Sequence, residues 1–201
     1  MNDQGEVESE PSDPINRLKN GPRYPFTESP RNHIGRDVRS GVYAIWRGED
    51  LIYAGFAGRD GARGGFVNRL LHHRRGDRSG DKFCVYVFDR YILPELNAIQ
   101  ITSAAAGRLK LDPLIREFVA NQLKYSYVPC ENQTEALELE ARVLRGELGA
   151  RPSLNSTRGD DGSPDEHDDS IVEDEGDVQV GDDPGIPGDG GGVAEGGAPE
   201  A

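Results

Sequence analysis

The sequence predicts an α+β domain built on a small, mainly antiparallel β-sheet flanked by helices, with disordered N- and C-terminal tails. Two short runs rich in apolar and aromatic residues, 41–46 and 51–58, are separated by four polar residues, which is typical of a β-hairpin. Segments with helical spacing follow, and they do not alternate strictly with strands as in a parallel sheet. Both chain ends lack a hydrophobic period, so neither is expected to form a core.

Charge is distributed very unevenly along the 201 residues, whose formal net charge is −13. Residues 36–155 carry 15 acidic and 18 basic side chains. Residues 156–201 carry 15 acidic side chains and a single base, Arg158. The acidic character therefore belongs to the C-terminal segment, while the central segment is slightly basic.

The expected domain organisation follows from this composition. Residues 1–37 are expected to form a disordered or loosely ordered arm, because five prolines punctuate it, with some order near Tyr24 and Phe26. Residues 38–157 are expected to form the folded domain, which is long enough for one modest core. Residues 158–201 are rich in Gly, Asp and Pro, so this tail is expected to stay disordered.

The elements of the domain are predicted in order from local patterns. A glycine-rich loop, 59–65, leads into a helix whose apolar residues recur at helical spacing until Gly76 ends it. Residues 82–93 are rich in β-branched and aromatic residues and predict a strand. Pro113 is typical of the first position of a helix, which is expected to run to about Leu123.

The rest of the domain is predicted as a strand, a helix and a closing segment. Residues 123–130 alternate as a strand does, 134–147 have helical spacing, and 151–155 close the domain as an extended segment. The inward-facing residues of the last helix are expected to be Ala136, Leu137, Leu139, Val143 and Leu144.

Composition also limits the class of protein. The two cysteines, Cys84 and Cys130, lie in apolar stretches and are expected to be buried thiols. No apolar run approaches the roughly 18 residues of a membrane span. Residues 1–10 are acidic and polar, unlike a signal peptide. We therefore expect a cytoplasmic protein that does not enter a membrane.

Several short motifs occur in an order that resembles one known family. Along the chain they are GVY at 41–43, YAG at 53–55, Arg69 and His73 on the first helix, TEALELEARVL at 134–144, and a P-x-x-N stretch at 152–155. Together they resemble the GIY-YIG nucleases, and the resemblance covers over half of the chain. It implies a GIY-YIG-like fold and a metal-dependent endonuclease that hydrolyses DNA phosphodiester bonds.

Two features depart from the family's pattern. Ala54 stands where the family usually has isoleucine, a change that we expect to affect packing more than chemistry. Residues 82–123 make the middle of the domain longer than the minimal family core, and they are expected to add a strand and a helix. The order of the motifs is unaffected.

The resemblance implies a role for each charged residue of the motifs. Glu140 would hold one Mg²⁺ or Mn²⁺ ion, which accepts a single carboxylate together with waters and phosphate oxygens. Glu138, two residues away, is the alternative ligand. Arg69 would polarise the scissile phosphate, because its planar guanidinium can contact two oxygens at once. The alternatives are a solvated helix carboxylate and a surface arginine.

The resemblance also implies that Tyr43 and His73 position the attacking water and that Tyr53 hydrogen-bonds nearby. His73 lies on the same helix face as Arg69 and titrates near neutrality. A phenol has an ordinary pKa of about 10, so Tyr43 could act as a base only with help, and water positioning is its minimum role. For both tyrosines the alternative is core packing. Asn155 is expected to support the site through its amide.

Residues 59–78 are expected to contact a nucleic acid backbone, because they include six arginines, two histidines and only two acids. The alternative is a solvated helix end. DNA is the expected partner, and no organic cofactor is expected. No motif that reads bases is present, so structure-selective or non-specific cleavage is expected as much as sequence-specific cleavage. The candidate contacts are Arg59, Arg63, His72, Arg74, Arg75 and Arg78.

Two other functions compete with the nuclease hypothesis. One is a nucleic-acid-binding module of the same fold that does not cut, and the other is an interaction protein that uses its acidic tail. The tail could also compete with DNA for the arginines, although a role in solubility explains the same composition. The nuclease hypothesis requires Arg69 and Glu140 to reach one shared surface.

Overall fold

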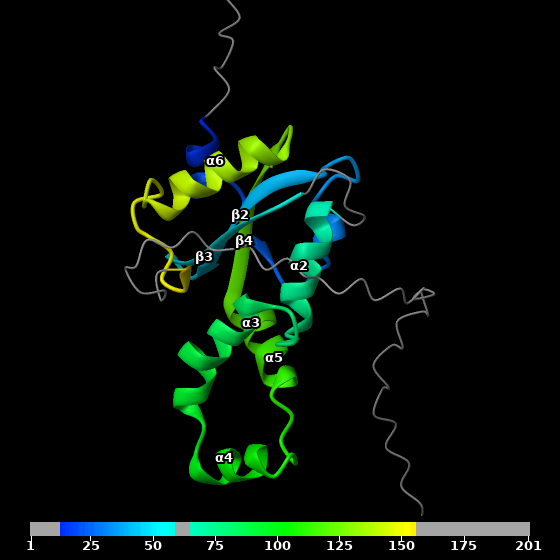
Figure 1. Ribbon diagram of the computed structural model, residues 1–201, viewed down its shortest axis with the longest axis vertical. Helices are drawn as coiled ribbons and strands as arrows, with labels where there is room; N and C mark the ends of the chain where they lie inside the picture. Colours follow the sequence, from blue (N-terminus) through cyan, green and yellow to red (C-terminus); the bar gives the residue numbers. More distant parts are fainter. Residues whose placement is uncertain (1–12, 59–64, 156–201) are drawn as a thin grey trace, which may run out of the picture. The chain divides into compact units, whose positions relative to one another are not determined.

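The computed structural model of the protein describes residues 13–58 and 65–155, and in this part it has a four-stranded antiparallel sheet and six α-helices (Figure 1). The strand order is β1-β4-β2-β3, and each neighbouring pair is antiparallel. The predicted α+β class with a small antiparallel sheet is therefore confirmed. The strands are β1 (Tyr24–Pro25), β2 (Ser40–Arg47), β3 (Asp50–Ala57) and β4 (Leu123–Cys130).

The β2–β3 hairpin lies where the sequence predicts it. Gly48 has a φ of 59° in the turn, a conformation that glycine adopts without strain. Tyr43 pairs with Gly55, and Ile45 pairs with Tyr53. Because residues that pair directly share a face, and residues two apart on a strand also share one, Tyr43 and Tyr53 project from the same face of the sheet.

Helices cover both faces of the sheet. The core on one face, which we call the first core, contains Tyr43 and Tyr53 and is covered by α2, α3 and α5. The core on the other face, the second core, contains Val42 and Ala44 and is covered by α1 and α6. Figure 1 shows α2 and α6 on the two sides of the strands. The bounds are α1 (Pro14–Asn20), α2 (Gly65–Arg75), α3 (Lys82–Val87), α5 (Asp112–Gln122) and α6 (Gln133–Leu144).

The segment 82–93 is helical, so the predicted strand is wrong. After α3 the chain continues through a π-helical turn, η2 (Phe88–Ile92), and a 3-10 turn, η3 (Leu93–Glu95). The β-branched and aromatic composition that suggested a strand reflects burial in the first core. The spacing of the buried residues is helical and was visible in the sequence: Phe83, Cys84, Val87, Phe88 and Ile92.

Residues 13–37 are folded against the sheet, so the expectation of a loose arm is wrong from residue 13 onward. The side chain of Asp13 caps α1. Leu18 of α1 is fully buried in the second core, and Phe26 is fully buried in the first. Asp13 followed by Pro14 is a signal for the start of a helix. Pro14 is one of the five prolines of this segment, and the signal is therefore easily read as part of a proline-rich loop.

The remaining elements match the predictions with some differences. Strand β4 and helices α2, α5 and α6 are confirmed, with α6 ending at Leu144 rather than at 147. Leu137 of α6 is exposed, although an inward orientation was predicted. The closing segment 151–155 contains a turn and is not extended throughout. Two short helices were not predicted: η1 (Pro30–Asn32) and α4 (Ala98–Ala105).

Both cysteines are free, Cys84 buried and Cys130 half-buried. Across residues 13–58 and 65–155, no helix combines the length and the hydrophobicity that a membrane span needs. Residues 1–12, 59–64 and 156–201 lie outside the described residues, and so do the predicted C-terminal tail and most of the predicted glycine-rich loop.

Candidate active site

The hydroxyl of Tyr43 lies at the centre of a buried polar cluster on the first-core face of the sheet. It is 2.8 Å from Nε2 of His73, which approaches from α2. Gly55, its partner on β3, leaves room for the hydroxyl, because a Cβ at this position would lie 2.5 Å from the hydroxyl oxygen. Tyr43 and His73 are both fully buried. The structure therefore brings together two of the residues that the motifs single out.

Tyr53 joins the cluster from β3. Its ring packs edge-on against His73, with ring centroids 5.9 Å apart, and it is 8% exposed. Burial raises the pKa of both Tyr43 and Tyr53, and the nearby charge of Arg69 opposes this rise. Both phenols are therefore protonated at neutral pH.

A residue that sequence reasoning missed, Asp81, completes the cluster. Its Oδ2 lies 2.7 Å from Nδ1 of His73, and the thiol of Cys84 donates to the same oxygen at 3.4 Å. Its Oδ1 accepts a hydrogen bond from the backbone N–H of Phe83 at 3.1 Å and so caps α3. A strand at 82–93 gives Asp81 no role, whereas a helix that starts at Lys82 needs a capping residue such as aspartate at position 81.

The His73–Asp81 pair consists of a neutral imidazole and a carboxylate. Burial lowers the pKa of His73, and the charge of Asp81 offsets this only in part. Burial raises the pKa of Asp81, but the interactions with His73, Arg69 and Cys84 outweigh it and leave this pKa below its ordinary value. The negative charge therefore resides on Asp81 at neutral pH.

Arg69 supplies a cation to the cluster. It lies one turn before His73 on α2 and is half-buried. Its guanidinium lies close enough to Tyr43 and Tyr53 for its charge to lower the pKa of both phenols. A negative charge that develops near the Tyr43 hydroxyl would therefore face a guanidinium.

Glu140 reaches the cluster from α6, although α6 and α2 cover opposite faces of the sheet. Its Oε1 accepts a hydrogen bond from the backbone N–H of Phe56 at 3.1 Å, so the carboxylate lies against the outer strand, β3. Its charge raises the pKa of both Tyr43 and Tyr53. Arg69 and Glu140 thus act on the same two hydroxyls, although their helices cover opposite faces of the sheet.

The surroundings of α6 distinguish the two candidate metal ligands. Glu140 is 7% exposed and contacts β3, whereas Glu138 is exposed. Within the described ranges, no three His, Cys, Asp or Glu side chains form a group that could hold a metal ion. A single carboxylate suits Mg²⁺ or Mn²⁺ when waters and phosphate oxygens supply the other ligands. The donor set is therefore compatible with a single such ion.

Asn155 supports the strand that carries Tyr53 and Gly55. Its Oδ1 accepts a hydrogen bond from the backbone N–H of Ala54 at 2.8 Å, and its Nδ2 donates to the carbonyl of Ala54 at 2.9 Å. These two bonds satisfy the backbone groups of Ala54 at the outer edge of β3. Asn155 thus makes the backbone contact expected of a supporting residue.

Two of the predicted nucleic-acid contacts hold parts of the chain together. Arg74 donates to the backbone carbonyls of Phe26 and Thr27, at 2.9 and 3.4 Å. Arg78 pairs with Asp112 at 3.1 Å. These contacts tie α2 to the N-terminal segment and the turn after α2 to α5, so part of the basic character of residues 59–78 serves the fold.

The other predicted contacts differ in exposure. Arg75 is exposed and His72 is half-buried on α2. Burial and the neighbouring Arg75 lower the pKa of His72, so this ring is neutral at pH 7. Arg59 and Arg63 lie outside the described residues. Arg75 is therefore the described arginine of this group best placed to meet a polyanion.

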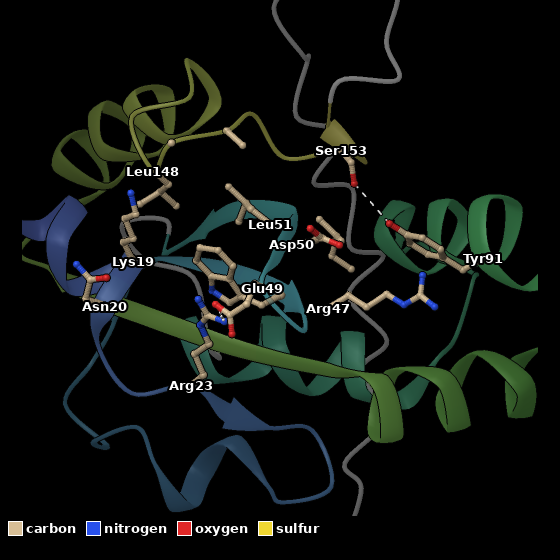
Figure 2. A pocket seen from close by; sticks show the side chains of 14 residues that line it. Lys19, Asn20, Arg23, Arg47, Glu49, Asp50, Leu51, Tyr91, Leu148 and Ser153 are labelled. Atoms are coloured by element: carbon tan, nitrogen blue, oxygen red, sulfur yellow. Dashed lines mark hydrogen bonds and ion pairs between the residues drawn. The ribbon is translucent and has the colours of Figure 1, made fainter.

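A separate cavity of about 480 Å³ lies by the turn of the β2–β3 hairpin (Figure 2). The guanidinium of Arg23 lies over the ring of Trp46, 4.1 Å from its centroid. The guanidinium of Arg47 lies 5.0 Å from the ring centroid of Tyr91. Lysine, arginine and acidic side chains mix in its lining, and none of the Tyr43 cluster lies there. This cavity is distinct from the candidate active site.

Comparisons of the chain with models of protein families, with curated proteins and with solved structures found no match. The resemblance to the GIY-YIG nucleases accordingly rests on the motifs themselves. In the structure, the residues of these motifs lie around residues 53–56 of β3. They are Tyr43, Tyr53, Arg69, His73 and Glu140.

Proposed function

We propose that the chain is a metal-dependent endonuclease of the GIY-YIG type that hydrolyses DNA phosphodiester bonds. The observation that supports this most is the surroundings of one hydroxyl. Tyr43 hydrogen-bonds to His73, and the charges of Arg69 and Glu140 both act on it. A core tyrosine needs one partner for its hydroxyl, and burying charged groups around it costs stability. Such clusters of perturbed ionisable groups are typical of functional sites.

Three of these residues act directly on the scissile phosphate and the attacking water. Arg69 donates to the phosphate oxygens, where its fork can make two hydrogen bonds. Tyr43 holds the water and takes up its proton while its own proton passes to Nε2 of His73, which lies 2.8 Å away. Glu140 would hold one Mg²⁺ or Mn²⁺ ion, which when bound stabilises negative charge on the phosphate and on the leaving oxygen.

The bond changes of this hydrolysis balance. The water oxygen forms the new bond to phosphorus, and the ester oxygen leaves with the electron pair of the bond that breaks. The leaving oxygen takes a proton from solvent, and His73 returns one proton to solvent. The phenol, the imidazole and the carboxylates end in their starting states.

Nicking of a supercoiled plasmid by the full chain tests this function. We expect nicking in Mg²⁺, loss of nicking in EDTA, and recovery when Mg²⁺ or Mn²⁺ is restored. Glu140→Ala is expected to abolish it. Nicking that persists in EDTA or in Glu140→Ala would contradict the proposal, as would a wild-type chain that leaves the plasmid intact.

A second candidate is a nucleic-acid-binding module of the same fold that does not cut. The complete burial of Tyr43 and His73 favours it, because a buried hydroxyl cannot touch a substrate until the groups that cover it move. Binding of DNA without nicking in the same buffers, measured by fluorescence anisotropy, would support this candidate. The third candidate, an interaction through the acidic tail, concerns residues outside the described ranges.

A further inference from the structure

We propose that Asp81 is a positioning residue that fixes the tautomer of His73, so that Nε2 carries no proton and accepts the hydrogen of the Tyr43 hydroxyl. This inference deepens the proposed nuclease function and, as a role in catalysis, rests on it. The observation that carries it is a buried chain of two short contacts, 2.7 Å from Asp81 to His73 and 2.8 Å from His73 to Tyr43.

The ionised carboxylate of Asp81 determines the direction of both hydrogen bonds. An ionised carboxylate has acceptors only, so Nδ1 of His73 must carry the hydrogen that it shares with Asp81. A neutral imidazole has one ring hydrogen, so Nε2 is left as an acceptor. The hydroxyl of Tyr43 then donates to it. Asp81 thus determines which way the proton of Tyr43 points.

Asp81 is itself held in place. Its Oδ1 accepts from the backbone N–H of Phe83, and its Oδ2 accepts from the thiol of Cys84. The backbone contact belongs to the cap of α3, so the position of the carboxylate is set by the start of that helix. Since Asp81 is 3% exposed, solvent hardly competes for these bonds.

The arrangement suits transfer of one proton. When the proton of Tyr43 moves to Nε2 of His73, a phenolate and an imidazolium form. The phenolate faces Arg69, and the imidazolium faces Asp81, which stays ionised throughout. Asp81 therefore assists a proton transfer without exchanging a proton itself, as the aspartate of serine-protease triads does.

Asp81→Asn is the discriminating variant. Its amide oxygen can still accept from the backbone of Phe83, so the cap of α3 is kept. Its NH₂ group then faces Nδ1 of His73 and donates to it, which moves the ring hydrogen to Nε2. Nε2 would then donate to the oxygen of Tyr43 and could no longer accept its proton. By analogy with the same change in serine proteases, we expect the cleavage rate to fall by about 10⁴ with DNA affinity unchanged.

The tautomer can be measured without any assay of cleavage. The full chain has four histidines, so ¹⁵N-histidine labelling gives few ring signals, and His73→Gln identifies those of His73. We expect the Nδ1–H tautomer in the wild type and the Nε2–H tautomer in Asp81→Asn. The matched control, Asp112→Asn, alters an aspartate that pairs with Arg78 and should leave the tautomer unchanged.

Each result decides one question. An Nε2–H tautomer in the wild type overturns the inference, and this measurement needs no variant to fold. An unchanged tautomer in a folded Asp81→Asn also overturns it. The expected tautomers in a chain that never nicks DNA would support the positioning and reject the nuclease function alone. Nicking that survives the expected tautomer change would reject the role of Asp81 alone.

Discussion

The carboxylate of Glu140 accepts a hydrogen bond from the backbone N–H of Phe56 at 3.1 Å, which places a side chain of α6 against the outer strand of the sheet. The strand position before Phe56 is Gly55, over which the hydroxyl of Tyr43 lies on the first-core face. The carboxylate of α6 and the phenol of β2 therefore lie against two neighbouring residues of β3.

Replacement of Glu140 by glutamine removes the charge and keeps the shape. The amide oxygen can still accept from Phe56, so we expect little change in Tm. We expect Mg²⁺-dependent nicking to fall by about 100-fold or more, because the metal loses its anionic ligand. Glu138→Gln, at an exposed position of the same helix, is the matched control and should cut at the wild-type rate. The reverse pattern would assign the ligand to Glu138.

Tyr43→Phe removes one hydroxyl from the buried cluster. We expect destabilisation by about 1–3 kcal/mol, because Nε2 of His73 loses its buried partner, together with loss of nicking. Tyr125→Phe is the control, since the Tyr125 hydroxyl is buried without a hydrogen-bond partner among the described residues, and its removal should not destabilise the chain. Urea unfolding and plasmid nicking measure the two effects. Wild-type cutting by Tyr43→Phe would leave this residue a packing role only.

Arg69→Ala is expected to slow single-turnover cleavage by about 10²–10³, the usual cost of losing a donor aimed at developing charge. Arg69→Lys should recover only part of the rate, because an ammonium cannot make the paired contacts of a guanidinium. Arg75→Ala, an exposed change on the same helix, should weaken DNA binding in low salt and leave the rate on saturating DNA unchanged. If Arg69→Ala and Arg75→Ala slowed cleavage of saturating DNA equally, Arg69 would have no specific role at the scissile phosphate.

Stability should fall as the solution is acidified from about pH 7.5 to pH 5. Burial lowers the pKa of His73 below its ordinary value of about 6.5, so the unfolded chain binds a proton more readily than the folded chain. The contribution of His73 to folding stability is therefore complete above about pH 6.5 and is lost as the pH falls through the lowered pKa of this residue. The pKa of His72 is also lowered, so His72 contributes to stability with the same sign. We expect a smaller decline of Tm in His73→Gln. Parallel Tm curves for the two chains would show that His73 does not couple to folding.

Deletion of residues 158–201 removes 15 acidic side chains and Arg158. If these charges compete with DNA for the arginines of residues 59–78, the shortened chain will bind DNA more tightly at low ionic strength, and the two affinities will converge in high salt. Anisotropy titrations with a labelled duplex at two salt concentrations measure this. Equal affinities at low salt would leave solubility as the explanation of the acidic composition.

Local patterns in the sequence were enough for the hairpin and for most of the long helices. The hairpin could be predicted because two apolar runs flank a polar turn, and α6 because its apolar residues repeat at helical spacing. For residues 82–93, the β-branched and aromatic composition predicts a strand, whereas the spacing of the apolar residues fits the helix that forms. The role of Asp81 could not be predicted from a strand, because it caps the helix that follows it.

The geometry of the candidate site could be predicted only in part. The motifs named Tyr43, Arg69, His73 and Glu140, but the spacing along α6 does not show that Glu140 meets the backbone of β3. Arg74 and Arg75 likewise look alike in the sequence. Arg74 is held by carbonyls of the N-terminal segment while Arg75 is exposed, because their partners depend on chain packing that no local pattern encodes.

The amide of Asn155 bonds to both backbone groups of Ala54, 101 residues earlier in the chain. On the ribosome, the hairpin therefore emerges long before the residue that closes its outer edge has been added. Until then, the N–H and C=O groups of Ala54 are open to pairing with a strand of another chain. The strand that carries Tyr53 and Gly55 acquires these last bonds only when translation reaches residue 155, so nascent chains cannot complete this edge while the domain is still being made.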